Sequence, residues 1–241
     1  MTTDILQSIR PVYLFDPDGN VNSSLDPWTN HAARVIKDTY GDTVLVKPKN
    51  LLKFGQNPNV GTSETTVMEL AGSEIAETYV STNIIDTISS DDGDNTQAVK
   101  IEGHTIDGNG NLTFVVQSAT LNGQNKVTLG TPLARATRIY NNSGTVLAAN
   151  SKVYVYEDSA ITTGTPDDDT KVHLIMSAGE EQSLKAATAF SNVDYGLVTS
   201  IYGGVNKKTS ALVDIRLKIR EKNGVFRTQF LDTVNSAGSG S

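Results

Sequence analysis

The sequence contains no cysteine, which excludes disulfide bonds, thiolate nucleophiles and cysteine-ligated metals. None of its apolar runs approaches the roughly 18 residues that a membrane-spanning helix needs. The first residues, MTTDILQSIRPVYLF, lack the basic start and sustained apolar stretch of an export signal. We therefore expect a protein that is made in the cytoplasm, is stabilised by packing and enters no membrane.

An excess of basic residues is also lacking. The 241 residues include 20 Lys and Arg against 27 Asp and Glu, which gives a net charge of -7. Proteins that bind phosphate backbones concentrate positive charge, and here charges of both signs are scattered. Nucleic acid is therefore not an expected partner.

Local motifs of catalysis and cofactor binding are absent. The sequence has no Gly-x-Ser-x-Gly, no phosphate-binding loop and no dinucleotide-binding glycine pattern, and its histidines are far apart: His31, His104 and His173. We expect these histidines to lie at the surface or half-buried. The sequence predicts no catalytic residue and no cofactor, although a carboxylate pair brought together from distant strands would leave no local pattern. An enzyme therefore remains an alternative.

Three acidic stretches raise the question of a metal site: Asp16–Asn20, Asp91–Asn95 and Asp167–Asp169. An EF-hand loop needs oxygen ligands at fixed spacing and a distant glutamate, which these stretches lack. Each contains or adjoins glycine or proline, as turns do. We therefore expect turns and no metal, with an irregular calcium site as the alternative. SSDDGDNT should lead into the strand AVKIEG, and DGNGN should form the turn before LTFVVQSATL.

Short runs of β-branched and aromatic residues, separated by turn residues, fill the chain from about residue 75. This pattern predicts a mainly β protein, with an antiparallel β-sandwich of jelly-roll-like form over residues 76–231. The stretch GEEQSLKAATAF is the one ambiguous segment in this half. Its Leu184, Ala186, Thr188 and Phe190 suit alternate positions of a strand, which we favour over a helix.

A hairpin is predicted near the C-terminus. In LVDIRLKIRE, apolar residues from Val213 to Ile219 alternate with charged ones, and Asn223-Gly224 suits a tight turn. Counting from that turn pairs Leu217 with Phe230 and Ile219 with Thr228. Phe226 and Phe230 would then share a buried face with Leu217 and Ile219. The closing residues 232–241 are expected to be a flexible tail.

Residues 1–75 are predicted to form an extended arm with one short helix over 27–40. Asp26 can cap this helix, Pro27 suits its first turn, and Gly41 can end it. Trp28, Val35 and Ile36 share one face with Ala32 and Tyr40. Such a stripe is typical of a face packed on the protein's own core, and a partner-binding anchor is the alternative.

The order of several segments resembles a recurring type of tailed-bacteriophage virion protein. These segments are LLKFGQNPNVGTSETTVMEL, IIDTISSDDGDNTQAVKIEGHTIDGNGN, LNGQNKVTL, ATRIYNNSG and MSAGEEQSLKAATAF, which together span about residues 51–190. The likeness lies in the succession of an FG-x-N segment, a Ser-Ser-Asp loop, an LNG turn and an R-I strand. It implies a non-enzymatic virion structural protein, a head decoration or cement protein that binds the major capsid protein of a tailed phage. It also implies assembly in the host cytoplasm and location in the virion.

The N-terminal region is expected to carry the partner contacts, because it contains more apolar groups than an irregular segment readily buries. The expected partner-binding residues are Tyr13, Leu14, Phe15, Trp28, Val35, Ile36, Leu51, Leu52 and Phe54. We also expect self-association as a dimer or trimer. The alternative is a neck, tail or fibre protein that binds carbohydrate or a receptor, for which Tyr154 and Tyr156 on one strand face would be candidates, although such pairs are more often packing residues.

Overall fold

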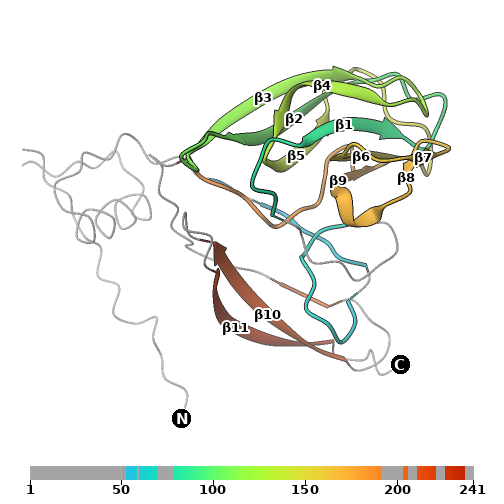
Figure 1. The fold of residues 1–241 in the computed structure, drawn as a ribbon. Helices are drawn as coiled ribbons and strands as arrows, with labels where there is room; N and C mark the ends of the chain where they lie inside the picture. Colours follow the sequence, from blue (N-terminus) through green and yellow to red (C-terminus); the bar gives the residue numbers. More distant parts are fainter. Residues whose placement is uncertain are drawn as a thin grey trace, which may run out of the picture. The chain divides into compact units, whose positions relative to one another are not determined.

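A computed structural model describes most of the chain beyond residue 50. The described residues are 51, 53–58, 60–69, 79–191, 203–205, 211–220 and 226–236. The chain divides into two compact units, and Leu52–Gly196 with Val205–Ser241 form the unit that holds nearly all of the described residues. That unit is mainly β with antiparallel pairing, as the sequence predicts (Figure 1). No helix among the described residues is long and apolar enough to cross a membrane.

Seven strands form two antiparallel sheets. The four-stranded sheet has the order β4-β1-β6-β9 and contains β1 (Ile85–Ser90), β4 (Val127–Leu133), β6 (Lys152–Glu157) and β9 (Val172–Ser177). The three-stranded sheet has the order β3-β2-β5 and contains β2 (Ala98–Ile106), β3 (Leu112–Thr120) and β5 (Arg135–Asn141). Only Ala134 separates β4 from β5, so the chain passes directly from one sheet into the other.

One cluster of buried apolar side chains joins the two sheets. The four-stranded sheet contributes Ile85, Ile88, Leu129, Leu133, Val153, Val155, Leu174 and Met176, and the three-stranded sheet contributes Val99, Ile101, Ala136 and Ile139. The two sheets therefore share one hydrophobic core, whose burial supplies the main favourable term in folding.

The other face of the four-stranded sheet is covered too. Tyr154 and Tyr156 of β6 lie there with Met68, Val172 and Ile175, and all five are buried. The cover includes Ile161 of β7 (Ile161–Thr162), which pairs with β8 (Thr165–Pro166); the short 3-10 helix η1 (Asp169–Lys171) follows and leads into β9 (Figure 1). Gly164, between β7 and β8, lies so close to the end of β1 that a Cβ on it would be 1.7 Å from the Ser90 carbonyl oxygen. Buried on both faces, β6 is thus a central strand.

Specific contacts close the outer edges of the two sheets. The Gln117 side chain of β3 donates to the Thr131 carbonyl oxygen at 2.7 Å and accepts from the Thr131 N–H at 2.9 Å. This amide acts like a peptide group of a neighbouring strand and links β3 to β4. On the opposite side, residues 181–186 run between β5 and β9, with isolated β-bridges from Gln182 to Tyr140 and from Ser183 to Met176.

The acidic stretch after β1 and the loop between β2 and β3 are turns, as predicted, whereas Asp169 begins the 3-10 helix η1 and Asp16–Asn20 lies outside the described residues. Asp107 accepts hydrogen bonds from the backbone N–H groups of Asn109 and Asn111, which closes the turn between β2 and β3. After β1, the Asp91 carboxylate accepts from the Lys152 N–H at 2.7 Å, so it supports the start of β6. In the residues that the structure describes, no three acidic or histidine side chains lie together as metal ligands.

The C-terminal hairpin is confirmed, but its predicted register is wrong by one residue. β10 (Ala211–Arg220) pairs with β11 (Phe226–Ser236), and Leu217 lies opposite Gln229 instead of Phe230. Because a shift of one residue moves side chains to the opposite face, Phe226 and Phe230 share a face with Arg220 and Arg216. The predicted buried face is also wrong, since Ile219, Phe226 and Phe230 are exposed. The predicted turn at Asn223-Gly224 lies outside the described residues.

Two predicted boundaries shift in the structure. Residues 232–236 belong to β11 and not to a flexible tail. Residues 53–57 and 66–69, which were expected to belong to the arm, attach to the β unit, because Met68 is buried and the Lys53 Nζ donates to the Thr137 carbonyl oxygen. The predicted helix 27–40 lies outside the described residues.

Candidate partner-binding surface

Three chain segments lie side by side at the edge of the β unit and carry one of the predicted partner-binding residues, Phe54. The Gln56 N–H donates to the Leu184 carbonyl oxygen at 3.2 Å, and the Ala186 N–H donates to the Val67 carbonyl oxygen at 2.9 Å. Met68 also forms an isolated β-bridge with Lys185. We call this arrangement of residues 53–57, 183–187 and 66–69 the three-segment platform.

Gly55 explains the tight packing of the platform. A Cβ at this position would lie 2.5 Å from the Ala186 Cβ and 2.6 Å from the Val67 carbonyl oxygen, so only glycine fits. The neighbouring Phe54 is held by this contact and yet remains 59% exposed. Val67 on the adjacent segment is 46% exposed, and Leu51, just before the platform, is 56% exposed. Exposed apolar side chains on a fixed backbone are suited to binding a protein partner.

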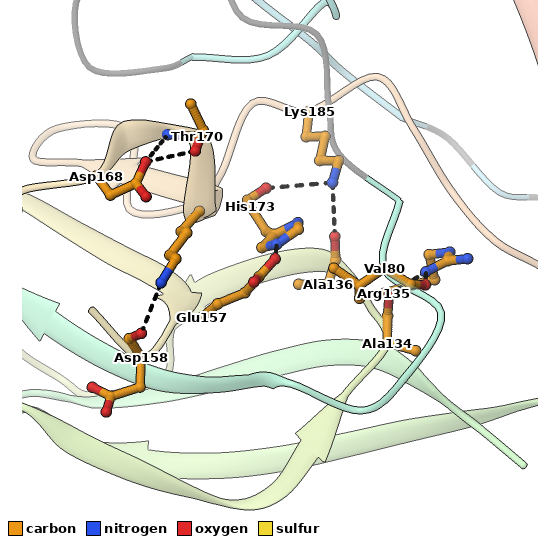
Figure 2. Close-up of polar contacts among 11 residues, drawn as sticks. Val80, Ala134, Arg135, Ala136, Glu157, Asp158, Asp168, Thr170, His173 and Lys185 are labelled. Atoms are coloured by element: carbon orange, nitrogen blue, oxygen red, sulfur yellow. Dashed lines mark hydrogen bonds and ion pairs between the residues drawn. The ribbon is translucent and has the colours of Figure 1, made fainter.

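Two lysines, the buried Lys185 and the half-buried Lys53, attach the platform to the sheets. Figure 2 shows the Lys185 ammonium, whose Nζ donates to the carbonyl oxygens of Ala136 at 2.9 Å and His173 at 3.3 Å. Lys185 is 3% exposed and links β5 to β9 through these two bonds. The Lys53 Nζ donates to the Thr137 carbonyl oxygen at 3.0 Å, and burial lowers the pKa of Lys53, an effect that the Glu102 carboxylate opposes.

The polar groups next to Lys185 are engaged in structural contacts. His173 is buried and its Nε2 lies 3.0 Å from Glu157 Oε1 (Figure 2). The hollow beside these groups, lined by Met68, Glu69, His173 and Lys185, is too small to admit a water molecule. This arrangement fits a structural role for the lysine and the histidine better than a catalytic one.

Several predicted residues take other places than expected. His104 and His173 are buried, whereas the sequence predicted surface or half-buried positions, because both lie in strands of the packed sheets. Tyr154 and Tyr156 are buried packing residues, so they offer no exposed aromatic face to a sugar. Burial and the nearby Asp91 carboxylate raise the pKa of Tyr154 to about 12.

The structure describes only part of the predicted partner-binding set. Leu51 and Phe54 are exposed as such a role requires. The other predicted positions lie outside the described residues: Tyr13, Leu14, Phe15, Trp28, Val35, Ile36 and Leu52. Val67 lies at the end of the N-terminal region that was expected to make the contacts, but it was not among the named residues, and no periodic pattern in its surroundings would have indicated it.

The segment GEEQSLKAATAF forms neither a helix nor the strand that we favoured: Gly179 and Glu180 lie in a turn, and Gln182, Ser183 and Lys185 form isolated β-bridges. Its buried residues are Ser183 and Lys185 and not the apolar Leu184 or Phe190. The reason is that the Ser183 hydroxyl accepts from the Ile139 N–H and the Lys185 ammonium reaches two sheet carbonyls. Comparison with protein families, curated proteins and solved structures finds no match to this chain.

Proposed function

We propose that this chain is a non-enzymatic structural protein of a tailed-phage virion, a decoration or cement protein that binds the major capsid protein lattice and other copies of itself. The observation that carries the proposal is the exposure of Phe54 and Val67 on the tightly packed three-segment platform. The order of segments that resembles phage virion proteins supplies the class of partner. Binding to many equivalent sites on a lattice would offset the modest area of each contact.

We infer further that the two sheets are the layers of a β-sandwich. The inference is supported by the core cluster that contains residues of both sheets and by the passage from β4 to β5 through Ala134 alone. The jelly-roll order of the strands stays a prediction. A neck, tail or fibre location stays the alternative, and the burial of Tyr154 and Tyr156 removes the aromatic pair that favoured a sugar-binding role.

The proposal predicts that Phe54→Asp abolishes attachment to capsids. Purified protein would be mixed with particles of the phage that carries the gene, prepared without this protein, and bound protein would be measured after sedimentation. We expect Phe54→Asp to bind at least about tenfold more weakly, because a charge replaces a central apolar anchor. Val60→Asp is the matched control, since Val60 is similarly exposed but lies outside the platform.

Two results would contradict this assignment. Equal binding by Phe54→Asp and wild type would place the contact elsewhere on the chain. Absence of the wild-type protein from purified virions, together with no binding to the particles, would refute the proposed function itself. Because Phe54 is exposed, the substitution should leave the unfolding free energy within about 0.5 kcal/mol of wild type.

A further inference from the structure

The hairpin β10–β11 has the two longest strands that the structure describes, and several of its apolar side chains are exposed. Within the described part of the chain, its two strands pair only with each other. Leu212 is 72% exposed and Phe230 is 55% exposed, while Val213, Ile215 and Leu217 are half-buried. A two-stranded ribbon is marginally stable alone, so such a hairpin gains from further strand pairing.

The two strands differ as edges for pairing. Between Ile215 and Arg216 the register shifts from Asp232 to Phe230, so Leu231 is an extra residue that forms a bulge in β11. Bulges twist an edge strand away from additional partners. β10 has no extra residue along its ten positions, so β10 is the edge suited to accept another strand.

The residues of β10 are complementary to themselves about Ile215. In an antiparallel pair of two β10 strands with Ile215 opposite Ile215, Val213 lies opposite Leu217 of the other copy. On the other face Asp214 lies opposite Arg216, and the two-fold axis produces each pair twice. Around the two-fold axis, apolar residues therefore meet apolar residues and opposite charges meet, whereas farther out Leu212 lies opposite Lys218.

Neighbouring registers lose this match. Centring the pair on Arg216 would place Arg216 opposite Arg216, and centring it on Asp214 would place two carboxylates together. In this structure Asp214 and Arg216 are each about half exposed and lie 3.7 Å apart within one strand, and Arg216 also lies 3.6 Å from the Glu64 carboxylate. Both side chains are therefore accessible to a second strand.

We propose that β10 pairs antiparallel with β10 of a second copy of this chain, with Ile215 at the two-fold axis, to form a continuous four-stranded sheet. The inference deepens the self-association in the proposed function and rests on that part of it. It requires no capsid, so dimerisation and capsid attachment can be measured separately.

A single cysteine tests the register directly, because the chain contains none. In directly opposed strand positions the Cα atoms lie about 4.5–5.5 Å apart, within the range of a disulfide. We expect oxidised Ile215→Cys protein to run as a covalent dimer on a non-reducing gel. Val213→Cys is the matched control on the same face, since two cysteines there would lie about 14 Å apart and should not cross-link.

Charge substitutions provide a second test that does not depend on cross-linking. Asp214→Arg and Arg216→Asp each place like charges together, and each should weaken dimerisation at least about tenfold in sedimentation velocity. The double variant should restore the dimer. Asp232→Arg makes the same change of charge on β11 and should leave dimerisation unchanged.

The outcomes separate this inference from the proposed function. A wild-type protein that stays monomeric at all concentrations overturns the inference. A dimer in which the Ile215→Cys variant fails to cross-link, or the Val213→Cys variant cross-links equally well, also overturns it, while capsid attachment can still hold. A dimer that the Ile215→Cys variant locks covalently, but that binds no capsid in its wild-type form, supports the inference and contradicts the proposed function.

Discussion

At the scale of single residues, Asn95 organises the corner between β1 and β6. Its side chain is fully buried, its Nδ2 donates to the hydroxyls of Ser90 and Ser151 at 2.8 Å each, and its Oδ1 accepts from the Ala148 N–H at 2.8 Å. Its carbonyl oxygen accepts from the Gly123 N–H at 2.8 Å. One residue thus connects the end of β1, the turn at residues 148–151 and Gly123.

We predict that Asn95→Ala lowers the free energy of unfolding by about 2–4 kcal/mol. The substitution leaves a buried N–H and two buried hydroxyls with fewer partners, and each such loss costs about 1–3 kcal/mol. Urea unfolding followed by circular dichroism measures the change. Asn109→Ala is the control, because Asn109 is exposed in the turn after β2 and its replacement should change the stability by at most about 0.5 kcal/mol. Equal stability of the two variants would contradict the role of Asn95.

We predict that the free energy of unfolding falls at alkaline pH because of Tyr154. Its pKa is raised from the ordinary value of about 10 to about 12 in the folded protein, chiefly by burial. A raised folded pKa stabilises the fold below pH 10, and this contribution is lost as the pH rises from about 10 to 12. Linkage gives a loss of roughly 1 kcal/mol by about pH 11.

The test compares Tyr154→Phe with wild type at about pH 7 and about pH 11. At neutral pH the variant should be about 1 kcal/mol less stable, because it lacks the hydroxyl that lies 3.2 Å from Asp91 Oδ2. At the alkaline pH the difference should nearly vanish, since only the wild type loses stability through this group. Tyr140→Phe controls for removal of a less buried hydroxyl. A constant difference at both pH values would refute the expected pH dependence.

At the scale of strands, the sequence predicts the alternation but not the faces that become buried. In KVYVYE of β6, the alternation separates Val153 and Val155 from Tyr154 and Tyr156, and the structure buries both sets. The sequence cannot indicate this, because the cover of the tyrosine face comes from Met68 and from segments after β6. The bulge at Leu231 is similarly invisible in the pattern, yet the register beyond it is reset.

The candidate partner-binding surface was likewise only partly predictable from the sequence. Phe54 and Leu51 were identified from apolar content alone, which does not distinguish residues that stay exposed from residues that pack. Val67 became part of the surface through its backbone bond to Ala186, which is far away in the chain. Contacts at such separation follow from the folded arrangement and leave no local pattern.

We predict that the Gln117 amide holds β3 and β4 together. Gln117→Ala should lower the unfolding free energy by about 1–2 kcal/mol and speed hydrogen exchange at the Thr131 amide, which loses its acceptor. Gln117→Glu keeps that acceptor, so exchange at the Thr131 amide should stay slow, although the variant loses the donor to the Thr131 carbonyl oxygen. Ser118→Ala, one residue on and exposed, is the control. Unchanged exchange at Thr131 in Gln117→Ala would contradict this role.

At the scale of the described β unit, closure of the sheet edges is the feature that connects fold to function. Gln117 links β3 to β4, and residues 181–186 cover the edges of β5 and β9. Covered edges prevent uncontrolled strand pairing between chains. The edge of β10 differs from these covered edges, because it has no bulge and no further strand pairs with it in the described part of the chain. This free edge fits the proposed contact between two copies.

The contacts of residues 53–67 determine which N-terminal deletions should leave the β unit stable. Deletion of residues 1–50 should leave the β unit folded, with a urea midpoint close to that of the full chain. Deletion of residues 1–67 should lower the unfolding free energy by about 2–4 kcal/mol, because it removes the Lys53 bond to Thr137, the Gln56 bond to Leu184 and the Val67 bond to Ala186.

The smaller deletion retains Phe54, so its binding to capsids separates a contact made by residues 1–50 from one made by the platform. If the larger deletion were as stable as the smaller one, residues 53–67 would be an attachment to the β unit and not a part of it.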